Sequence, residues 1–441
     1  MGALLGPDFP SDIGLAVSGG GDSMAMLTLA HNWTRVWGVR LWVVTVNHGL
    51  RDEAAAEAQL VAETCAELGH PHATLRWQWD GQGNVMDAAR RARLRLIDAW
   101  RGTLAHVLMA HTADDVAETF VMRLARGSGV DGLSAMAAAR TVDLPNPKTL
   151  GANEYSGTLP QQWTPRKGTA MRPARFQILR PCLEMTRAEL RHYLRTLKGT
   201  WIEDPTNDDP SYDRARVRRA LSTLSELGID PATLTNTAHR MARARSALRA
   251  RAVDVWSKIG TERDGHRDKL IDRDGFAAAE RDTQMRILAA VLQFISGNAY
   301  RPRAAPLEAL LDRLLAGGGG TLHGCEARAE PDHIRVFREY AAVAGVVQPL
   351  DAGLWDGCWR FRARGMNSDG LEIRALGDAG WEQLPPEHRT HLHAAARSLP
   401  ALWRGATLVG CPGLGFGTGV FATLCPMGRE GTTLIRFLNT H

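Results

Sequence analysis

Three consecutive glycines, Gly19, Gly20 and Gly21, stand directly after a short apolar run and directly before Asp22 and Ser23. Glycine reaches backbone conformations that other residues avoid, and its missing side chain lets a ligand approach the main chain. Exposed backbone N–H groups in such a loop, followed by a helix N-terminus, form a binding site for anions. The segment that starts at Ser18 therefore predicts a phosphate-binding loop, although a tight strand-to-helix turn would show the same glycines.

Polar side chains also follow two other apolar runs. His48 and Arg51 come after one of them, and His111, Asp115 and Glu118 come after another. The spacing of four and three residues places the last three side chains on one face of a helix. A histidine and two carboxylates on one face indicate metal binding or acid–base chemistry. An exposed helix start, where acidic residues favour the helix dipole, is the structural alternative.

Strands and helices alternate along the first part of the chain. Apolar, β-branched runs predict strands, and longer stretches between them predict helices. Such alternation indicates an α/β fold, in which helices cover both faces of a parallel sheet and ligands bind at the C-terminal ends of the strands. The predicted strands are Ile13–Gly19, Arg40–Gly49, His72–Trp79 and His106–Thr112, and the predicted helices are Asp22–Trp33, Glu53–Leu68, Val85–Trp100 and Ala113–Ala125.

Composition predicts a cytoplasmic globular protein. The chain has 441 residues, 44% of them hydrophobic and 23% charged, with a formal net charge of +5. Its six cysteines form no CxxC pair, which argues against a zinc ribbon or a redox pair and fits a reducing compartment. The first twelve residues do not resemble a signal peptide, and no apolar run approaches the roughly 20 residues that span a bilayer.

The string SGGGDS at residues 18–23 resembles the PP-loop of the ATP pyrophosphatases. Those enzymes cleave ATP between the α and β phosphates and adenylate an oxygen of their substrate. The resemblance implies that the loop grips pyrophosphate and that Asp22 helps to hold Mg²⁺, an ion that prefers carboxylate and phosphate oxygens.

Further motifs make the resemblance specific. Together they resemble the tRNA(Ile)-lysidine synthetase family over roughly residues 12 to 220. The motifs are NHGLR, HTADDVAET with RGSG, NVMDAARRARLRLI, ILRPCLEMTRAELRHYL and WIEDPTNDDPSYDRARVRRAL.

The family attaches L-lysine to the first anticodon base, a cytidine, of the minor isoleucine tRNA, tRNA(Ile) with a CAU anticodon. ATP first adenylates the C2 oxygen of the base and pyrophosphate leaves. The side-chain amine of lysine then attacks C2 and expels AMP.

The resemblance also implies roles for matching residues. The PP-loop residues, His48 and Arg51 bind ATP. The reaction centre comprises His111, Asp115 and Glu118 together with Arg214 and Arg218, of which one steadies negative charge on the adenylate. Asp22 and Asp115 hold the metal. Arg90 and Arg93, in the helix that resembles Ala-Ala-Arg-x-x-Arg, contact tRNA.

Two positions depart from the family pattern. Asn47 stands where the family usually has Asp, and Thr206 stands where Ser is common. Either hydroxyl can make the same local turn bond, whereas Asn47 removes a charge. Residues 141–177 are rich in Pro, Gly, Asn and Thr and predict an extended loop near the site.

Residues 214–251 contain nine arginines and two acidic residues. A solvated basic face would explain this pattern, but the resemblance favours contact with tRNA phosphates, with Arg240 and Arg243 on a predicted helix.

The predicted organisation has three parts. Residues 1–212 form a parallel-sheet PP-loop domain of the adenine nucleotide alpha hydrolase type. Residues 213–340 form a mainly helical, tRNA-contacting middle domain, and residues 341–441 form a small mixed α/β domain that docks tRNA. The scattered tryptophans of this last part are expected in its core. The sequence leaves the oligomeric state open, with a homodimer as one arrangement.

Three alternatives remain open. A PP-loop thiolase would typically carry cysteine pairs, which this chain lacks. A small-molecule synthetase would leave the basic region and the C-terminal domain unexplained. A catalytically degenerate tRNA-binding protein is disfavoured by the intact Asp22, Asp115 and Glu118, although Asn47 leaves room for it.

Overall fold

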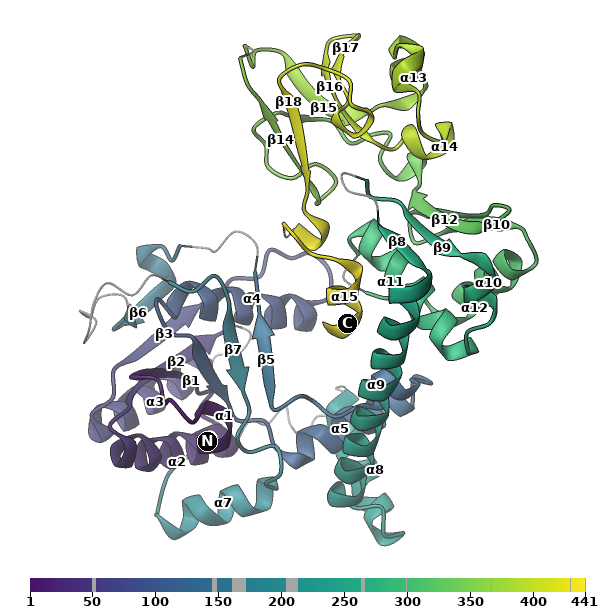
Figure 1. Ribbon diagram of the computed structural model, residues 1–441. Coiled ribbons are helices and arrows are strands. Elements are labelled where there is room, and N and C mark those ends of the chain that lie inside the picture. Colours follow the sequence, from purple (N-terminus) through teal and green to yellow (C-terminus); the bar gives the residue numbers. More distant parts are fainter. Residues whose placement is uncertain are drawn as a thin grey trace. The chain divides into compact units, whose positions relative to one another are not determined.

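The chain divides into two compact units, Met1–Arg245 and Ser246–His441. Figure 1 traces the chain in a computed structural model. The structure describes residues 1–49, 53–144, 149–160, 172–203, 213–262, 266–298, 300–365, 367–428 and 430–440. None of the helices in those ranges is long and apolar enough to cross a membrane.

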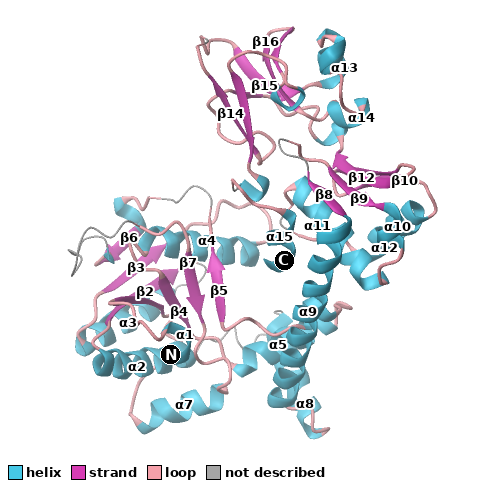
Figure 2. Cartoon of the chain, in the orientation of Figure 1, coloured by secondary structure: helices cyan, strands magenta, loops and turns pink. Residues whose placement is uncertain are grey.

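The first unit is built on one sheet with the strand order β5-β7-β4-β1-β2-β3-β6. The inner strands run parallel, and the edge strands β5 and β6 pair antiparallel with their neighbours. Figure 2 shows these strands between helices. The strands are β1 (Asp12–Ala16), β2 (Arg40–Asn47), β3 (His72–Arg76), β4 (His106–Met109), β5 (Ala139–Val142), β6 (Tyr155–Gly157) and β7 (Phe176–Leu179).

Helices cover both faces of this sheet, as the alternation of elements predicts. Side chains of α2, α3 and α7 share a core with one face of the strands, and α4 packs on the other face. The predicted helix Val85–Trp100 has the same first and last residues in the structure. The side chain of Asn84 caps its first turn by accepting a hydrogen bond from the backbone N–H of Asp87. The helices are α1 (Gly2–Leu5), α2 (Gly21–Trp37), α3 (Ala54–Leu68), α4 (Val85–Trp100), α5 (Ala113–Leu124), α6 (Val130–Leu133), α7 (Arg187–Thr196), α8 (Asp213–Glu226) and α9 (Pro231–Ile259).

Helix α8 and the first part of α9 belong to the first unit. Phe120 on α5 shares a small core with Leu221 on α8 and with Leu234 and Ala238 on α9. The predicted division at residue 212 stays a prediction, since residues 204–212 lie outside the described part. The packing on α5 explains why the compact unit continues to Arg245.

The segment 141–177 is not only a loop. Its described residues include strand β6 and the ends of strands β5 and β7. Strand β5 pairs antiparallel with strand β7. Phe176 and Ile178 on β7 are buried in the core that lies against α4. The expectation of an extended loop was therefore wrong for these parts, because polar and glycine-rich composition does not reveal short edge strands that gain stability from non-local pairing.

The second unit begins with an antiparallel sheet in the order β10-β11-β12-β9-β8, beside helices that share its core. Residues 213–340 contain helices, as expected, and the same region also contributes the short strands of this sheet. The strands are β8 (Gly260–Glu262), β9 (Lys269–Asp272), β10 (Gly319–Leu322), β11 (Cys325–Ala329) and β12 (His333–Arg338). The helices are α10 (Arg273–Ala277), α11 (Arg281–Ser296), α12 (Ala304–Leu315) and α15 (Leu434–Thr440).

The remaining C-terminal residues form two small antiparallel sheets, β13-β15-β16-β17 and β14-β18. Trp355, Trp359 and Trp403 are buried and Trp381 packs against the same cores, which confirms that these tryptophans are core residues. The elements are β13 (Gln348–Pro349), β14 (Trp359–Ala363), β15 (Leu371–Ala375), α13 (Gly377–Gln383), α14 (His393–Ala396), β16 (Pro400–Arg404), β17 (Thr407–Gly410) and β18 (Val420–Leu424). The predicted division at residue 340 stays a prediction.

A buried ion pair fastens the end of α4. Arg101 is fully buried and donates from Nε to Oδ1 of Asp98 at 2.8 Å, and its other nitrogens donate to the carbonyls of Leu104 and Pro173. Asp98→Ala leaves this guanidinium buried without its counter-charge, so we expect the free energy of unfolding to fall by about 3–5 kcal/mol. Urea unfolding followed by circular dichroism measures this loss.

The matched control is Asp87→Ala on the same helix, where Asp87 and Arg90 form an exposed pair at 3.8 Å. That substitution is expected to cost no more than about 1 kcal/mol. Equal losses for the two variants would contradict the assigned role of the Asp98–Arg101 pair.

Candidate active site

The glycine loop connects the end of β1 to the start of α2, as predicted. Gly19 has a φ of +89°, and a Cβ atom there would lie 3.3 Å from the carbonyl oxygen of Glu57. The hydroxyl of Ser23 donates to the carbonyl of Gly20 at 2.9 Å and accepts from the backbone N–H of Ser18 at 3.1 Å. These bonds fix the loop around the N-terminus of α2, which is the end of a helix that attracts anions.

Asp22 lies in the first turn of α2 and meets an arginine from α7. Nε of Arg187 donates to its Oδ2 at 3.2 Å, whereas its buried Oδ1 accepts no hydrogen bond from the residues that the structure describes. Burial raises the pKa of Asp22 more than the positive charge of Arg187 lowers it. A buried carboxylate in this condition gains from a further cation nearby.

The start of α5 holds Asp115 through a capping box. Thr112, the N-cap residue, accepts from the backbone N–H of Asp115, and Oδ2 of Asp115 accepts from the backbone N–H of Thr112 at 2.9 Å. Its other oxygen, Oδ1, lies 4.0 Å from Nη2 of Arg187. His111 precedes the cap, so it does not share a helical face with Asp115 and Glu118, and that expectation was wrong.

Glu118 forms ion pairs with arginines from two helices, α7 and α8. Its side chain is 1% exposed, and Oε1 accepts from Nη1 of Arg187 at 3.2 Å and from Nε of Arg218 at 2.7 Å. Arg214 lies farther away, with Nε 3.9 Å from Oε2. Burial lowers the pKa of Arg187, but Glu118, Asp22 and Asp115 together raise it well above the ordinary value. The structure thus brings Asp22, Asp115 and Glu118 together around one guanidinium.

His111 is held as a neutral ring. Nε of Arg180 donates to its Nδ1 at 3.3 Å, and a guanidinium only donates, so the ring proton sits on Nε2. Burial lowers the pKa of His111 to about 4, and the nearby Arg180, Arg93 and Arg214 also lower it, against the opposite effect of Asp115.

Asn47, at the end of β2, stabilises the turn that follows the strand. Its side-chain oxygen accepts from the backbone N–H of Gly49 at 2.8 Å, a bond that an aspartate would also make. His48 packs edge-on against Trp77, and burial lowers its pKa to about 4, with Arg93 adding to the effect. Arg51 lies outside the described residues.

Buried histidines make the first unit sensitive to acid. The folded-state pKa values of His48, His72 and His111 are about 4, below the ordinary value of 6.5. Between those values the unfolded chain binds more protons than the folded chain, so stability is present in full above pH 6.5 and falls as the pH drops toward 4. Each histidine contributes at most about 1.4 kcal/mol per pH unit.

The test compares the wild type with His72→Gln, because His72 lies in β3, away from the glycine loop, and its Nε2 lies 2.9 Å from the Thr45 hydroxyl. Urea midpoints measured at several pH values are expected to fall more steeply with acid in the wild type. Parallel curves would contradict the assigned titration.

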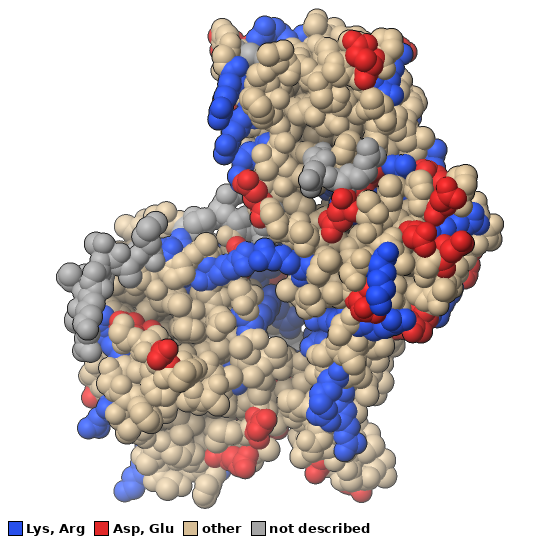
Figure 3. Space-filling view, in the orientation of Figure 1, with Lys and Arg blue, Asp and Glu red and all other residues tan. Residues whose placement is uncertain are grey.

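Basic side chains lie on two helices of the predicted RNA surface. Arg90 is exposed on α4, while Arg93 lies near His48 and His111 and helps to lower their pKa values. Desolvation lowers the pKa of Arg93 itself, and the nearby Arg214 adds to that effect. Arg240 and Arg243 are exposed on α9. Lys and Arg side chains gather over both helices on the face drawn in Figure 3. All four arginines are exposed, and Arg93 in addition lies near two histidines of the candidate site.

Sequence reasoning missed two arginines of this site. Arg180 follows β7 and orients His111, and Arg187 joins three carboxylates. One signal was available for Arg187, because it is the first residue of α7, where a positive charge opposes the helix dipole. Its backbone N–H also donates to Oδ2 of Asp114 at 2.7 Å, which locks this helix start against α5.

Comparisons with known proteins identify relatives of this chain. Residues 1–224 match the family model described as a PP-loop domain. Over 423 residues the chain is 39% identical to the tRNA(Ile)-lysidine synthase of Ruegeria pomeroyi, covering 94% of this chain and 91% of that protein. It is 36% identical to the synthase of a Bradyrhizobium species, covering 70% and 82%, and 33% identical to that of Hyphomonas neptunium, covering 76% and 83%. Each match is longer than either compact unit, so the similarity extends beyond the PP-loop domain.

Proposed function

The chain belongs to the family of tRNA(Ile)-lysidine synthases, and from this membership we propose that it joins L-lysine to C2 of the wobble cytidine in tRNA(Ile) with a CAU anticodon. ATP drives the reaction. The observation that carries the proposal is the cluster of Asp22, Asp115 and Glu118 around Arg187, next to the glycine loop. It unites a phosphate-binding loop with the charges that adenylation requires.

In the first step, the C2 oxygen of cytidine forms a bond to the α-phosphorus of ATP, and the bond between the α and β phosphates breaks. The backbone N–H groups around Gly20 and the N-terminus of α2 bind the leaving pyrophosphate. His111, protonated at Nε2, donates a hydrogen bond to a phosphate oxygen and does not act as a base. Negative charge that develops on the phosphate is stabilised by arginine.

The residues present fit Mg²⁺. Asp22 offers a buried oxygen without a hydrogen-bond donor among the described residues, and Asp115 keeps Oδ1 outside the capping box. These two carboxylates would hold the ion, which supplies positive charge to the phosphates when bound. Arg187 neutralises the same carboxylates from the protein side.

In the second step, the side-chain amine of lysine attacks C2, the C–O bond to the adenylate breaks and AMP leaves. The lysine ammonium transfers a proton to water before attack, and a carboxylate beside the ammonium group positions it. Arg90, Arg93, Arg240 and Arg243 contact tRNA phosphates in this proposal, with the salt dependence that such contacts produce.

The test measures ATP–pyrophosphate exchange and incorporation of labelled lysine into purified tRNAs. The expected result is lysine incorporation into tRNA(Ile) with the CAU anticodon and none into methionine tRNA with the same anticodon. Exchange without lysine transfer would point to another nucleophile, and no exchange with any tRNA would support a binding protein without catalysis.

The two arginines of α8 are expected to differ in importance. Arg218 is 28% exposed and is fixed by Glu118 at 2.7 Å, whereas Arg214 is 45% exposed and lies 3.9 Å from the same carboxylate. A fixed guanidinium stabilises developing charge without reorganisation, so Arg218→Gln should lower kcat by about 10²–10³. Arg214→Gln should lower it by less than about tenfold.

Single-turnover lysidine formation with saturating ATP measures both rates, and each variant is the control for the other. The reverse order of effects would assign the stabilising role to Arg214.

A further inference from the structure

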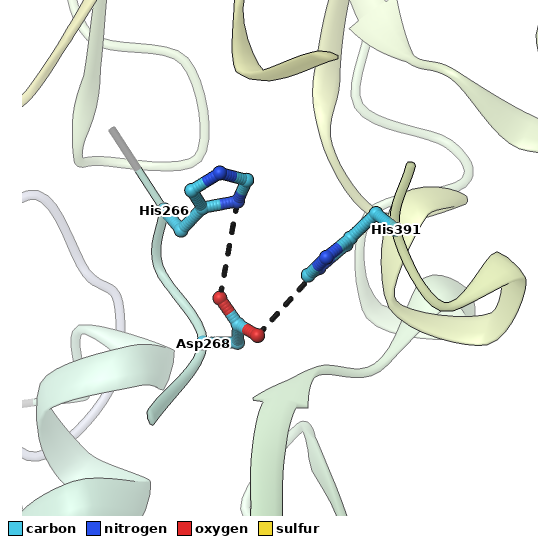
Figure 4. Close-up of side chains that lie close together, drawn as sticks. All are labelled: His266, Asp268 and His391. Carbon is cyan, nitrogen blue, oxygen red and sulfur yellow. Dashed lines mark ion pairs between the residues drawn. The ribbon is translucent and has the colours of Figure 1, made fainter. Parts of the chain in front are cut away.

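Three side chains of metal-binding type meet in the second unit, apart from the candidate active site. His266 and Asp268 come just before β9, and His391 comes two residues before α14. One ligand atom from each lies within 4.8 Å of the other two. Figure 4 shows both imidazole rings beside the carboxylate. We propose that His266, Asp268 and His391 bind one divalent transition-metal ion, with Zn²⁺ as the preferred ion.

The distances suit a tetrahedral ion. Nδ1 of His266 is 4.0 Å from Oδ1 of Asp268, and Nε2 of His391 is 3.6 Å from Oδ2. Zinc bonds of about 2.1 Å at tetrahedral angles place neighbouring ligand atoms about 3.4 Å apart. The two distances run to different oxygens of Asp268, so binding one ion would require the side chains to rotate until both ring nitrogens face the same carboxylate oxygen.

The burial of Asp268 is an independent reason to expect a bound cation. The residue is 5% exposed, and its Oδ1 accepts no hydrogen bond from any residue in the described ranges. A buried carboxylate oxygen without a donor costs free energy, which a coordinated cation removes. Oδ2 accepts from Nη1 of Arg335 at 2.8 Å, the kind of outer contact that orients a metal-binding carboxylate.

The charges around the cluster select the class of metal. Arg335 also binds Glu330 at 2.7 Å, and Arg267 and Arg338 both pair with Asp356. The other nearby carboxylates, Glu330 and Asp356, are thus paired with arginine. Asp268 is the one carboxylate among the three proposed ligands. Mg²⁺ and Ca²⁺ prefer several oxygen ligands, whereas zinc and its neighbours bind neutral imidazole nitrogen strongly.

Space for a fourth ligand lies beside the cluster. A cavity of about 10 Å³ is lined by Asp268 and His391 and also by Arg267 and Arg338, whose guanidiniums pair with Asp356. That volume is close to the minimum that holds one water molecule. Three protein ligands and one water complete a tetrahedral site. The ion would tie the entry of the β9 strand to the segment before α14, which lie more than a hundred residues apart in the chain.

The experiment uses the full chain, purified without a polyhistidine tag. Zinc per chain is measured by mass spectrometry after dialysis against metal-free buffer and zinc addition, and about one ion is expected. His391→Ala and Asp268→Asn are expected to retain less than about a tenth of this zinc. The matched control is His393→Ala, because His393 is half exposed on the same segment and pairs with Asp378 at 3.2 Å.

Two further measurements guard against a variant that fails to fold. His266→Ala changes the least buried ligand, and it should keep the wild-type circular dichroism spectrum while losing zinc. Cobalt added to the wild type should give visible ligand-field bands that His266→Ala lacks, and zinc should raise the thermal midpoint of the wild type by several degrees, roughly 5 °C. No zinc in the wild type, or equal zinc in the wild type and in folded His266→Ala, would overturn the proposal.

Discussion

Glu118→Gln is expected to lower the rate of lysidine formation by about 10²–10⁴ while leaving the chain folded. Glutamine keeps the shape of the side chain but removes the charge that Arg187, Arg214 and Arg218 share. Without it, three guanidiniums stand together without their shared counter-charge and lose their positions. Single-turnover incorporation of lysine into tRNA(Ile) measures the loss.

The control is Glu226→Gln, which neutralises an exposed glutamate on α8. It should change the rate by less than about twofold, as expected for a surface charge. Urea unfolding of both variants separates lost activity from lost structure. A folded Glu118→Gln enzyme with the wild-type rate would show that the buried carboxylate is not needed to position the arginines.

Asp22→Asn is expected to lower ATP–pyrophosphate exchange by about 10²–10³. The substitution removes the negative charge at the N-terminus of α2 and the ion pair with Arg187, which is 3.2 Å away. Because the amide still fills the same space, the loop around Gly19 should keep its shape. Initial exchange rates over a range of Mg²⁺ concentrations show whether the defect lies in metal use.

Asp8→Asn, at an exposed position near the N-terminus, is the control and should leave exchange unchanged. The proposed role of Asp22 predicts that excess Mg²⁺ restores part of the exchange in Asp22→Asn. Wild-type exchange at every Mg²⁺ concentration would contradict that role.

Local patterns predicted most of the first unit. The βα alternation located β1 to β4 and the helices between them, because each buried strand is a short apolar run that ends at polar residues. The edge strand β5 and its neighbour β7 escaped prediction. Each is four residues long, and they pair with one another across a gap of more than thirty residues. Their stability comes from that pairing and from packing on α4, which no local pattern contains.

The candidate site likewise contains residues that the sequence pointed to and residues that only the structure revealed. The glycine loop and the start of α5 follow strand ends, where a parallel sheet binds its ligands. Spacing singled out Asp115 and Glu118, whereas the role of Asp22 came from the resemblance to the PP-loop, and the roles of all three residues stay predictions. Arg187 reaches them only because α7 packs beside α2 and α5. Its role depends on tertiary contacts between segments about 165 residues apart, such as the bond from Arg187 to Asp22. The position of His111 outside α5 follows from the choice of Thr112 as N-cap.

The capping box of Thr112 and Asp115 has a consequence for how this enzyme tolerates change. One carboxylate both starts a helix and faces Arg187, with one oxygen for each task. Fraying of the first turn of α5 and disassembly of the reaction centre are therefore a single event. Substitutions that loosen this turn are expected to lower activity before they unfold the chain. Their effect on the reaction rate will therefore exceed their effect on the free energy of unfolding.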